Sequence, residues 1–405
     1  MRLCLTGSYS FSFCWIQASA NKSKTKGGLY FLKQCKQNIR TKQAQTFLFL
    51  NPMKLKDLLY KITHWENWNY QLKYIPIGPV WILYCIRSRN PWFFTASNPT
   101  LTFGGFEGEG KKEMYEQLPT GTYPKTIYIN PSQAFAAVQK MVADNGFTYP
   151  FIAKPDVGMM GFMVRKISTA AQLELYHSTI SIQYIIQTLV EYPVEVAIFY
   201  YRLPHQDRGI ISGMLKKEPA YITGNGIDTI EMLMENNEYI RFKLQELKKR
   251  NTQQLQHILP AGERYNLSLA SNRSQGGMLQ GIDEEIDEKL KILLDSWSHY
   301  SGKFYYGRYD IKCTSVASLK EGKDFSILEF NGAGAGIQHI LANNYSLFKA
   351  MSIILHHWKI MFQIARYNHR QGVQYWNIKK GWLFLKAARK NLLMLKKMDS
   401  EFHSF

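Results

Sequence analysis

The order of apolar segments between residues 131 and 336 constrains the fold of this 405-residue chain more than any other feature. Helical patterns occupy 131–145, which is followed by Gly146, then 224–250, which begins in a glycine turn, and 283–302, which ends at Gly302. Runs of β-branched and aromatic residues predict strands at 149–156, 162–167, 181–190, 194–203, 304–315 and 324–332. Because helices and strands do not alternate one by one, the pattern indicates an α+β fold rather than a doubly wound sheet.

Two pairs of these strands are expected to form hairpins. Residues 149–156 and 162–167 flank a Gly-Met-Met-Gly turn, and residues 304–315 and 324–332 flank a loop at 321–324. Successive side chains of a strand point to opposite faces, so polar residues two positions apart on paired strands share one surface.

The net charge of +19 lies almost wholly at the two ends of the chain. Residues 1–53 hold eight Lys and Arg and no acid, and residues 345–405 hold eleven against two. A nucleic-acid-binding domain needs basic groups on its folded body, so nucleic acid is not expected as a partner. The predicted domains are a basic disordered tail, with a cleaved signal peptide as the alternative for its start, an aromatic-rich N-terminal domain, the α+β domain and a basic helical extension: 1–52, 53–130, 131–345 and 346–405.

Cysteine usage and hydropathy bear on the compartment. Five widely spaced cysteines without a CxxC pair favour neither a disulfide framework nor a thiolate zinc site, and they fit a reducing cytoplasm. No run reaches the roughly 18 apolar residues that span a bilayer. Peripheral membrane contact is left open by two segments: residues 79–87 suit either an interfacial segment or a buried strand or helix, and the C-terminal helices either pack on their own domain or lie on lipid.

Oxygen-bearing side chains gather on the second predicted hairpin. Arg308 and Asp310 share a face of one strand, and Glu329 and Asn331 share a face of the other. Two carboxylates and a carboxamide are oxygen ligands that Mg²⁺ accepts. The sequence therefore predicts a metal site, with a solvated hairpin face as the alternative.

A lysine stands at the end of the apolar strand in the first hairpin. Lys154 immediately precedes the loop bracketed by Gly158 and Gly161, where backbone N–H groups can cradle phosphate. No Gly-Lys-Ser/Thr sequence follows, so this is not a Walker loop. The lysine, the glycine loop and then the acidic trio, in this order, indicate a nucleotide site.

With these motifs the sequence resembles the ATP-grasp superfamily, specifically its carboxylate–amine ligases of the D-alanine–D-alanine ligase type, over about residues 130–340. The resemblance implies an ATP-grasp fold, in which two α+β subdomains grip ATP. It implies that Lys154 and the loop hold the ATP phosphates and that Arg308 lies near the transferred phosphate. The implied loop residues, two of them methionines where small residues are usual, are Gly158, Met159, Met160 and Gly161. The implied metal ligands are Asp310, Glu329 and Asn331.

The resemblance also assigns contacts to the nucleoside. It implies that the adenine meets a hinge strand formed by Gln187, Thr188, Leu189 and Val190, and that the ribose meets Glu195. Gln187 stands where an acid often accepts from the adenine amino group, and its carboxamide oxygen can still accept. A third phosphate contact falls on either Lys216 or Lys217.

The reaction implied by the resemblance uses ATP and Mg²⁺, with Mn²⁺ as the alternative ion. A small-molecule carboxylate takes the γ-phosphoryl group, and an amine then displaces phosphate from the acyl phosphate. The loop at 158–161 and residues 205–230 are expected to act as lids that exclude water. Three polar residues, either facing an acceptor pocket or lying on a surface loop, are Arg264, Asn266 and Arg273. The alternatives are an ATP-grasp kinase and a non-catalytic nucleotide-binding protein, either of them at a membrane surface.

Overall fold

A computed structural model describes residues 63–68, 70–268, 271, 273 and 276–402. The predicted tail at 1–52 lies outside the described residues. The chain divides into two compact units between Pro76 and Ile77. In the first unit the described residues form the 3-10 helix η1 (Trp65–Asn67) and the short helix α3 (Tyr70–Tyr74). All predicted site residues belong to the second unit.

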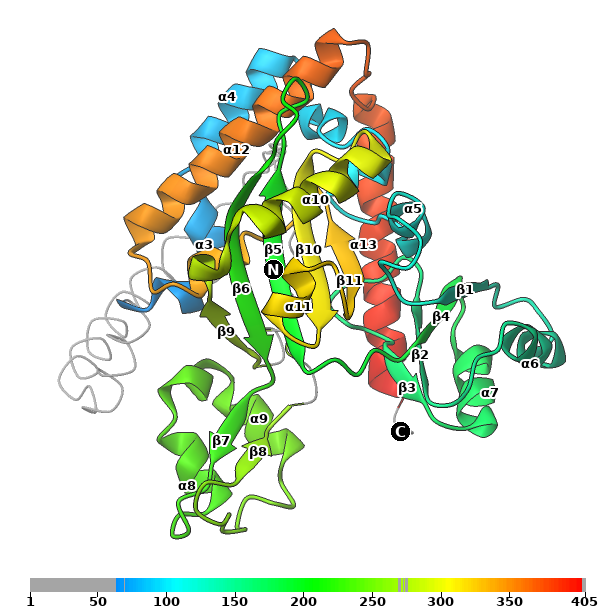
Figure 1. Ribbon diagram of the computed structural model, residues 1–405, viewed down its shortest axis with the longest axis vertical. Helices are drawn as coiled ribbons and strands as arrows, with labels where there is room; N and C mark the ends of the chain where they lie inside the picture. Colours follow the sequence, from blue (N-terminus) through cyan, green and yellow to red (C-terminus); the bar gives the residue numbers. More distant parts are fainter. Residues whose placement is uncertain (1–62, 69, 269–270, 272, 274–275, 403–405) are drawn as a thin grey trace, which may run out of the picture. The chain divides into compact units, whose positions relative to one another are not determined.

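A four-stranded antiparallel sheet, here the first sheet, has the strand order β1-β4-β2-β3. Its strands are β1 (Thr126–Ile129), β2 (Phe151–Pro155), β3 (Arg165–Ile167) and β4 (Tyr184–Thr188). The helices α6 (Phe135–Asp144) and α7 (Ala170–Thr179) lie beside it (Figure 1). Phe151 and Ala153 are fully buried in their common core, while Lys154 points to the other face of β2.

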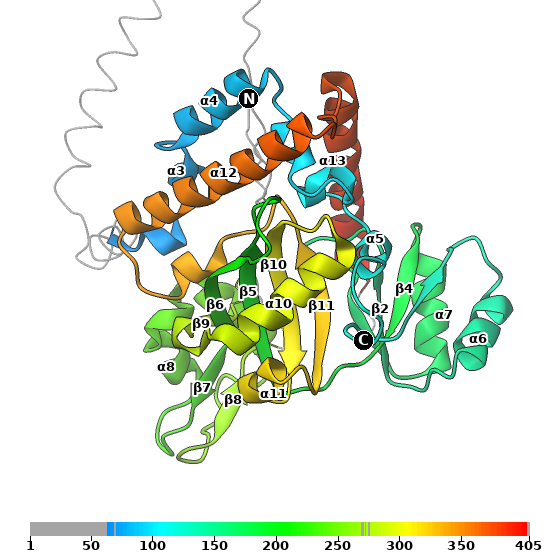
Figure 2. The ribbon, with the colours of Figure 1, turned by 45° about the horizontal axis from the view of Figure 1, so that its top comes forward.

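A five-stranded antiparallel sheet, here the second sheet, has the order β11-β10-β5-β6-β9. Its strands are β5 (Val194–Tyr201), β6 (Ile210–Glu218), β9 (Met278–Gly281), β10 (Tyr306–Cys313) and β11 (Phe325–Asn331). The helices α10 (Glu288–Ser301) and α11 (Val316–Lys320) cover one face (Figure 2). On the opposite face α12 (Leu347–Arg370) brings His357 edge-on to Phe199, with 4.5 Å between ring centroids.

These two antiparallel sheets with their helices make the chain an α+β protein, as predicted. The first hairpin forms, but its second strand is shorter than predicted and begins at Arg165, because the chain turns through a left-handed residue at Met163. The strands of the second pair also face one another, but the tight loop predicted between them is wrong. Helix α11 intervenes, and the Ser315 hydroxyl caps it by accepting from the Ser318 N–H at 3.0 Å.

A small lobe is inserted between β6 and β9. It contains β7 (Tyr221–Thr223), α8 (Ile230–Glu235), the 3-10 helix η4 (Glu238–Lys243), α9 (Leu244–Arg250) and β8 (Arg264–Asn266) around its own apolar core. The single long helix predicted for 224–250 is therefore wrong. The chain breaks at Asn236 and Asn237, where the Asn237 side chain accepts from the Tyr239 N–H at 3.0 Å and starts a new turn.

Residues 79–87, for which a strand and a helix were both open, belong to helix α4 (Gly78–Ser88). Its Trp81 and Tyr84 pack against Trp358 and Phe362 of α12, with ring centroids 5.1 and 4.4 Å apart. The remaining elements are η2 (Phe93–Ala96), η3 (Thr102–Gly105), α5 (Lys111–Tyr115), η6 (Asp283–Glu285), η7 (Gln338–Leu341) and α13 (Ile378–Glu401). Among the described residues, the helices are all too short or too polar to cross a bilayer.

Candidate functional site

The register of β10 and β11 sets the four predicted site residues of these strands opposite one another in two pairs. Arg308 faces Asn331, and Asp310 faces Glu329. This face of the second sheet is opposite the one covered by α10, because Tyr309 and Ile311 between them point into that core. The four side chains therefore lie on the surface of the sheet that its helices α10 and α11 leave uncovered.

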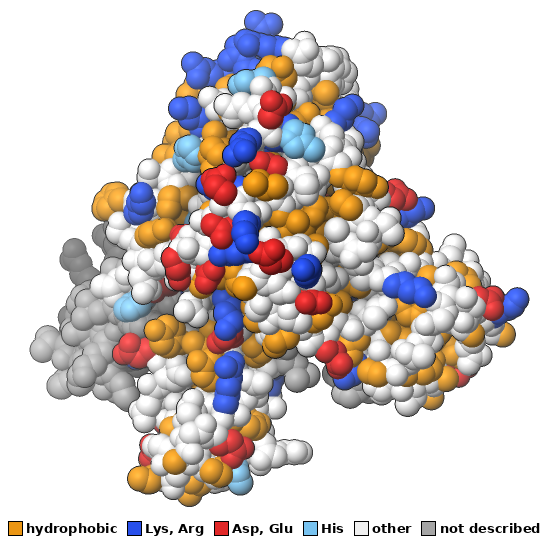
Figure 3. All heavy atoms as spheres, viewed as in Figure 1, with side chains coloured by type: hydrophobic (Ala, Val, Ile, Leu, Met, Phe, Trp, Pro, Cys, Tyr) orange, Lys and Arg blue, Asp and Glu red, His pale blue; other side chains and the backbone are white. Residues whose placement is uncertain are grey.

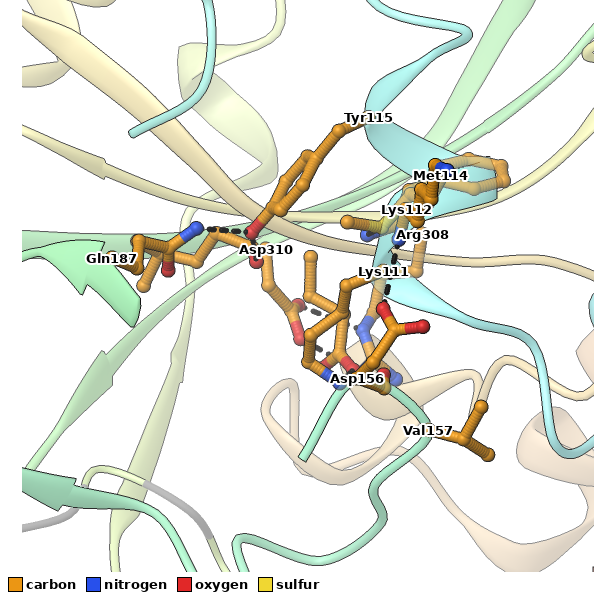
Figure 4. A network of polar contacts seen from close by, with 12 residues as sticks. Lys111, Lys112, Met114, Tyr115, Asp156, Val157, Gln187, Arg308 and Asp310 are labelled. Carbon is orange, nitrogen blue, oxygen red and sulfur yellow. Dashed lines mark hydrogen bonds and ion pairs between the residues drawn. The ribbon is translucent and has the colours of Figure 1, made fainter. Parts of the chain in front are cut away.

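Two cations hold the Asp310 carboxylate. Arg308, labelled with Asp310 in Figure 4, donates from Nε to Oδ1 (2.9 Å) and from Nη2 to Oδ2 (3.0 Å). The Lys217 Nζ lies 3.0 Å from Oδ1. Burial alone would raise the pKa of Asp310, but the charges of Arg308 and Lys217 outweigh it and lower the pKa to about 2. The Asp310 carboxylate therefore stays ionised at neutral pH, and its two ion pairs set its orientation.

The structure separates the two lysines between which the sequence could not choose. Lys217 is buried and also lies 3.5 Å from the Glu195 Oε1 of the neighbouring strand. Lys216 points to the other face of β6, where it pairs with Glu218 at 2.8 Å. Only Lys217 of the two reaches Asp310, and it joins Glu195 to the same charge network.

A small cavity of about 70 Å³ brings the two predicted hairpins together. It is lined by Lys154, by the loop residues Gly158, Met159, Met160 and Gly161, and by Glu329. The loop N–H groups at 158–161 have no hydrogen-bond acceptor within the described part of the chain. Burial, assisted by the charge of Lys111 and opposed by Glu329, lowers the pKa of Lys154 to about 7. Free N–H groups beside a buried lysine are what an oxyanion requires.

The sequence reading missed helix α5, which lies against the site (Figure 4). Lys111 lines the same cavity, with its Nζ 3.7 Å from Glu329 Oε1. Asp156, directly after β2, fixes the helix by accepting from the Lys112 N–H at 3.0 Å and, through its carbonyl, from the Lys111 N–H at 3.2 Å. One sequence signal could have indicated this helix: two lysines directly follow Gly-Glu-Gly at 108–110, and Lys154 also lies close to glycines.

A further carboxyl near this helix is perturbed. Burial raises the pKa of Glu109 to about 7, with Glu329 adding to the shift and Lys111 opposing it. The side chain was not singled out from the sequence. It adds a group that titrates near neutrality to the vicinity of Glu329.

The predicted hinge, Thr188 to Val190, connects the two sheets. The Thr188 N–H donates to the Lys125 carbonyl at 3.0 Å, and the Val190 carbonyl accepts from Lys312 at 3.1 Å. The Gln187 side chain is only 2% exposed, and its amide nitrogen donates to the hydroxyls of Tyr115 and Thr126 at 2.8 and 2.9 Å, while its predicted contact to adenine through the carboxamide oxygen stays a prediction. Its carboxamide therefore joins β4 to α5 and β1.

The glycines that follow β11 serve a contact inside the protein. A Cβ at Gly332 would lie 2.7 Å from the Gly104 carbonyl oxygen, and one at Gly334 would lie 1.9 Å from that of Phe106. The glycines thus allow a close approach to the backbone at 104–106, which pairs with Ala333 and Gly334 through hydrogen bonds of 3.0 and 2.9 Å. This contact places the segment that leads into α5.

The donor set on the second hairpin suits a hard cation. Asp310, Glu329 and Asn331 offer carboxylate and carboxamide oxygens, and the Asn331 amide nitrogen is buried without a partner among the described residues. No three His, Cys, Asp or Glu side chains within the described ranges are grouped to hold a metal. A metal here would therefore depend on Asn331 as its third ligand.

The polar residues proposed for an acceptor pocket lie in the small lobe. Arg264 is on β8, over the Tyr221 ring at 3.7 Å and 3.7 Å from Glu218 Oε2, and Arg273 lies over Phe242 at 4.5 Å. Asn266 pairs with Tyr221 across β7 and β8. They do not join the cavity at Lys154.

Comparison with known proteins gives structural likenesses only, since no protein-family model and no curated protein matches the sequence. A bifunctional glutathione synthetase from Pasteurella multocida aligns at 16% identity and a TM-score of 0.37, over 60% of this chain and 35% of that one. The ATP-grasp ligase PsnB with its minimal precursor aligns at 14% and 0.31, over 58% and 56%. D-alanine–D-alanine ligase from Bacillus anthracis aligns at 13% and 0.35, over 64% and 67%. The chain thus spans about a third and about half of the first two proteins.

Proposed function

We propose that this chain is an ATP- and Mg²⁺-dependent ligase that activates a carboxylate as an acyl phosphate and joins it to an amine. The observation that carries the proposal is the cavity shared by Lys154, the open N–H groups of residues 158–161, Lys111 and Glu329. It is a site for a polyanion beside a set of oxygen donors, and a triphosphate with its cation supplies both.

Each group has a task in this proposal. Lys154, Lys111 and the loop N–H groups bind phosphate oxygens, and Arg308 offsets charge on the transferred group. Asp310, Glu329 and Asn331 would hold Mg²⁺, or Mn²⁺, which supplies charge compensation on the triphosphate when bound. Thr188, Leu189 and Val190 meet the adenine and Glu195 the ribose, while Lys217 keeps Asp310 and Glu195 in place.

The proposed reaction needs no side-chain nucleophile. A carboxylate oxygen of the substrate attacks the γ-phosphorus, and the bond to ADP breaks. The amine then attacks the acyl carbon of the acyl phosphate, loses a proton, and phosphate leaves. The protein positions both substrates and keeps water from the acyl phosphate, and residues 158–161 are the candidate lid. The lid expected at 205–230 is not proposed, because residues 210–218 of that segment form β6, which is paired on both sides with β5 and β9.

Removal of either carboxylate tests the proposal. We expect Asp310→Asn and Glu329→Gln to reduce ADP formation by a factor of about 100 or more, because each removes an anionic oxygen ligand of the proposed Mg²⁺ ion. ADP would be measured with amino and hydroxy acids paired against amines. Glu284→Gln, an exposed acid of the same sheet region, is the matched control and should retain full activity.

The same assay separates the ligase from its rivals. Phosphate and ADP that appear only when a carboxylate and an amine are both present support the ligase. ADP together with a phosphorylated hydroxyl compound would indicate a kinase instead. Wild-type ADP formation in both carboxylate variants would contradict the assigned site altogether.

A further inference from the structure

A second, larger hollow lies away from the Lys154 cavity. This groove, of about 560 Å³, is bounded by α4, by α12 and by the turn at 203–205 that follows β5. Its cationic lining, here called the basic groove, consists of Arg87, Lys359, Arg366 and Arg370. Since Glu195 is at the start of β5 and the turn follows its end, strand β5 separates the groove from the candidate active site.

The charge of the basic groove is uncompensated. No Asp or Glu lines it, and within the described residues none of its four cations pairs with a carboxylate. Arg366 and Arg370 are four residues apart on α12, and like charges at this spacing repel. Tyr84 and Phe362, stacked at 4.4 Å, form an apolar wall beside them. A bound anion would relieve the repulsion, so the groove has the chemistry of an anion site.

Exposed apolar side chains lie on α4, which bounds the basic groove, and on the start of α13. On α4, Ile82, Leu83 and Ile86 are 41%, 46% and 67% exposed. On the first turns of α13, Trp382 and Leu383 are 50% and 59% exposed. These five residues are here called the apolar rim.

The segment that follows α4 is hydrogen-bonded to the start of α13. The Asn90 amide donates to the Trp376 carbonyl, and the Trp92 indole N–H donates to the Ile378 carbonyl, each at 3.1 Å. Lys and Arg side chains gather at the end of the molecule where α4 and α12 end (Figure 3). Apolar and aromatic side chains next to basic ones, without acids between them, are typical of a surface that lies at the headgroup level of a bilayer.

We propose that the surface formed by the basic groove and the apolar rim docks on an anionic membrane, with a lipid headgroup phosphate in the groove and the apolar rim in the interface between headgroups and lipid tails. A soluble phosphate would use the groove but would leave the rim in water, so the rim favours lipid. The inference goes beyond the proposed ligase and does not depend on it. It brings any product of the site close to a membrane.

Vesicle co-sedimentation of the full chain tests the inference. Vesicles of phosphatidylcholine with phosphatidylglycerol should bind it, and vesicles of phosphatidylcholine alone should bind it much less. The double variant Arg366→Gln/Arg370→Gln should lose affinity by a factor of about 25, roughly fivefold per charge. Lys166→Gln/Lys249→Gln removes two exposed charges elsewhere and should change affinity little.

A third variant tests the apolar rim. Ile86→Gln should abolish the binding that survives at roughly 0.5 M NaCl, where screening removes most of the electrostatic attraction. All variants change exposed side chains, and circular dichroism checks their folding. An equal loss of vesicle affinity in the two double variants would show that binding depends on the net charge of the protein and not on the basic groove, and it would overturn the inference. So would calorimetric binding of inorganic pyrophosphate in the groove without vesicle binding, which would identify a soluble ligand.

Discussion

Lys154 is the residue on which the proposed phosphate site depends most. It ends an apolar strand, so its ammonium group is drawn from water by the fold itself, and Lys111 beside it adds a second positive charge. With a pKa of about 7 the side chain is neutral in a large fraction of free molecules at neutral pH. A bound phosphate reverses this preference, because an adjacent anion stabilises the charged form.

The residue therefore predicts a pH-dependent affinity. Lys154 must take up a proton when ATP binds above about pH 7, so affinity should fall as pH rises, by up to about tenfold per unit. Calorimetry at about pH 6 and about pH 9, in buffers of different ionisation enthalpy, measures both the affinity and the proton uptake. In Lys154→Arg the guanidinium stays charged and the slope should vanish. An unchanged slope in that variant would assign the proton to another group.

At the scale of elements, strand β6 shows how alternation assigns different roles to adjacent residues. Lys217 lies on the face shared with Asp310 and Glu195, whereas Lys216 pairs with Glu218 on the opposite face. When Lys217 is removed, Glu195 loses its buried ion-pair partner and Asp310 keeps only Arg308. When Lys216 is removed, its partner Glu218 is partly exposed and stays in contact with water.

These two lysines predict different stabilities. Lys217→Met, which retains the length of the side chain, should lower the free energy of unfolding by about 3 kcal/mol. Lys216→Met should lower it by at most about 1 kcal/mol. Urea denaturation at neutral pH gives both values on one scale. Equal effects of the two substitutions would show that Lys217 is not the partner on which Asp310 depends.

Elements whose signals are local could be predicted from the sequence. Helix α10 ends at Gly302 in the left-handed conformation, as predicted, although it begins after the Asp287 cap and not at residue 283, and the polar alternation of β10 and β11 placed Asp310 opposite Glu329. Helix α5 could not be predicted, because it has five residues and is held by Asp156 from a distant strand. The break at Asn237 was missed because the flanking segments both carry helical patterns.

At the scale of the whole unit, contacts far apart in sequence set the arrangement. The Asn368 side chain donates to the Ala96 carbonyl at 2.8 Å, and Trp81 packs on Trp358. The aromatic segment before residue 106 therefore shares its core with the C-terminal helices, and no local pattern shows this. The boundaries predicted at 130 and 345 stay predictions. Residues of both sheets line the cavity at Lys154.

From that cavity we predict which backbone amides nucleotide binding should protect from hydrogen exchange. The N–H groups at 158–161 lack acceptors among the described residues, whereas the next turn is held by bonds such as Phe162 N–H to the Met159 carbonyl at 3.2 Å and Met163 N–H to Asp399 Oδ1 at 2.8 Å. If phosphate oxygens accept from these groups, Mg²⁺ and ATP should slow amide hydrogen exchange there by about tenfold or more, since exchange then requires release of the ligand. The core of the small lobe around α8 and α9 makes none of these contacts and should exchange at its free rate. Hydrogen-exchange mass spectrometry at saturating nucleotide measures both regions. Protection of the small lobe without protection of 158–161 would place the triphosphate elsewhere, because only a direct contact at the loop supplies acceptors to the loop amides.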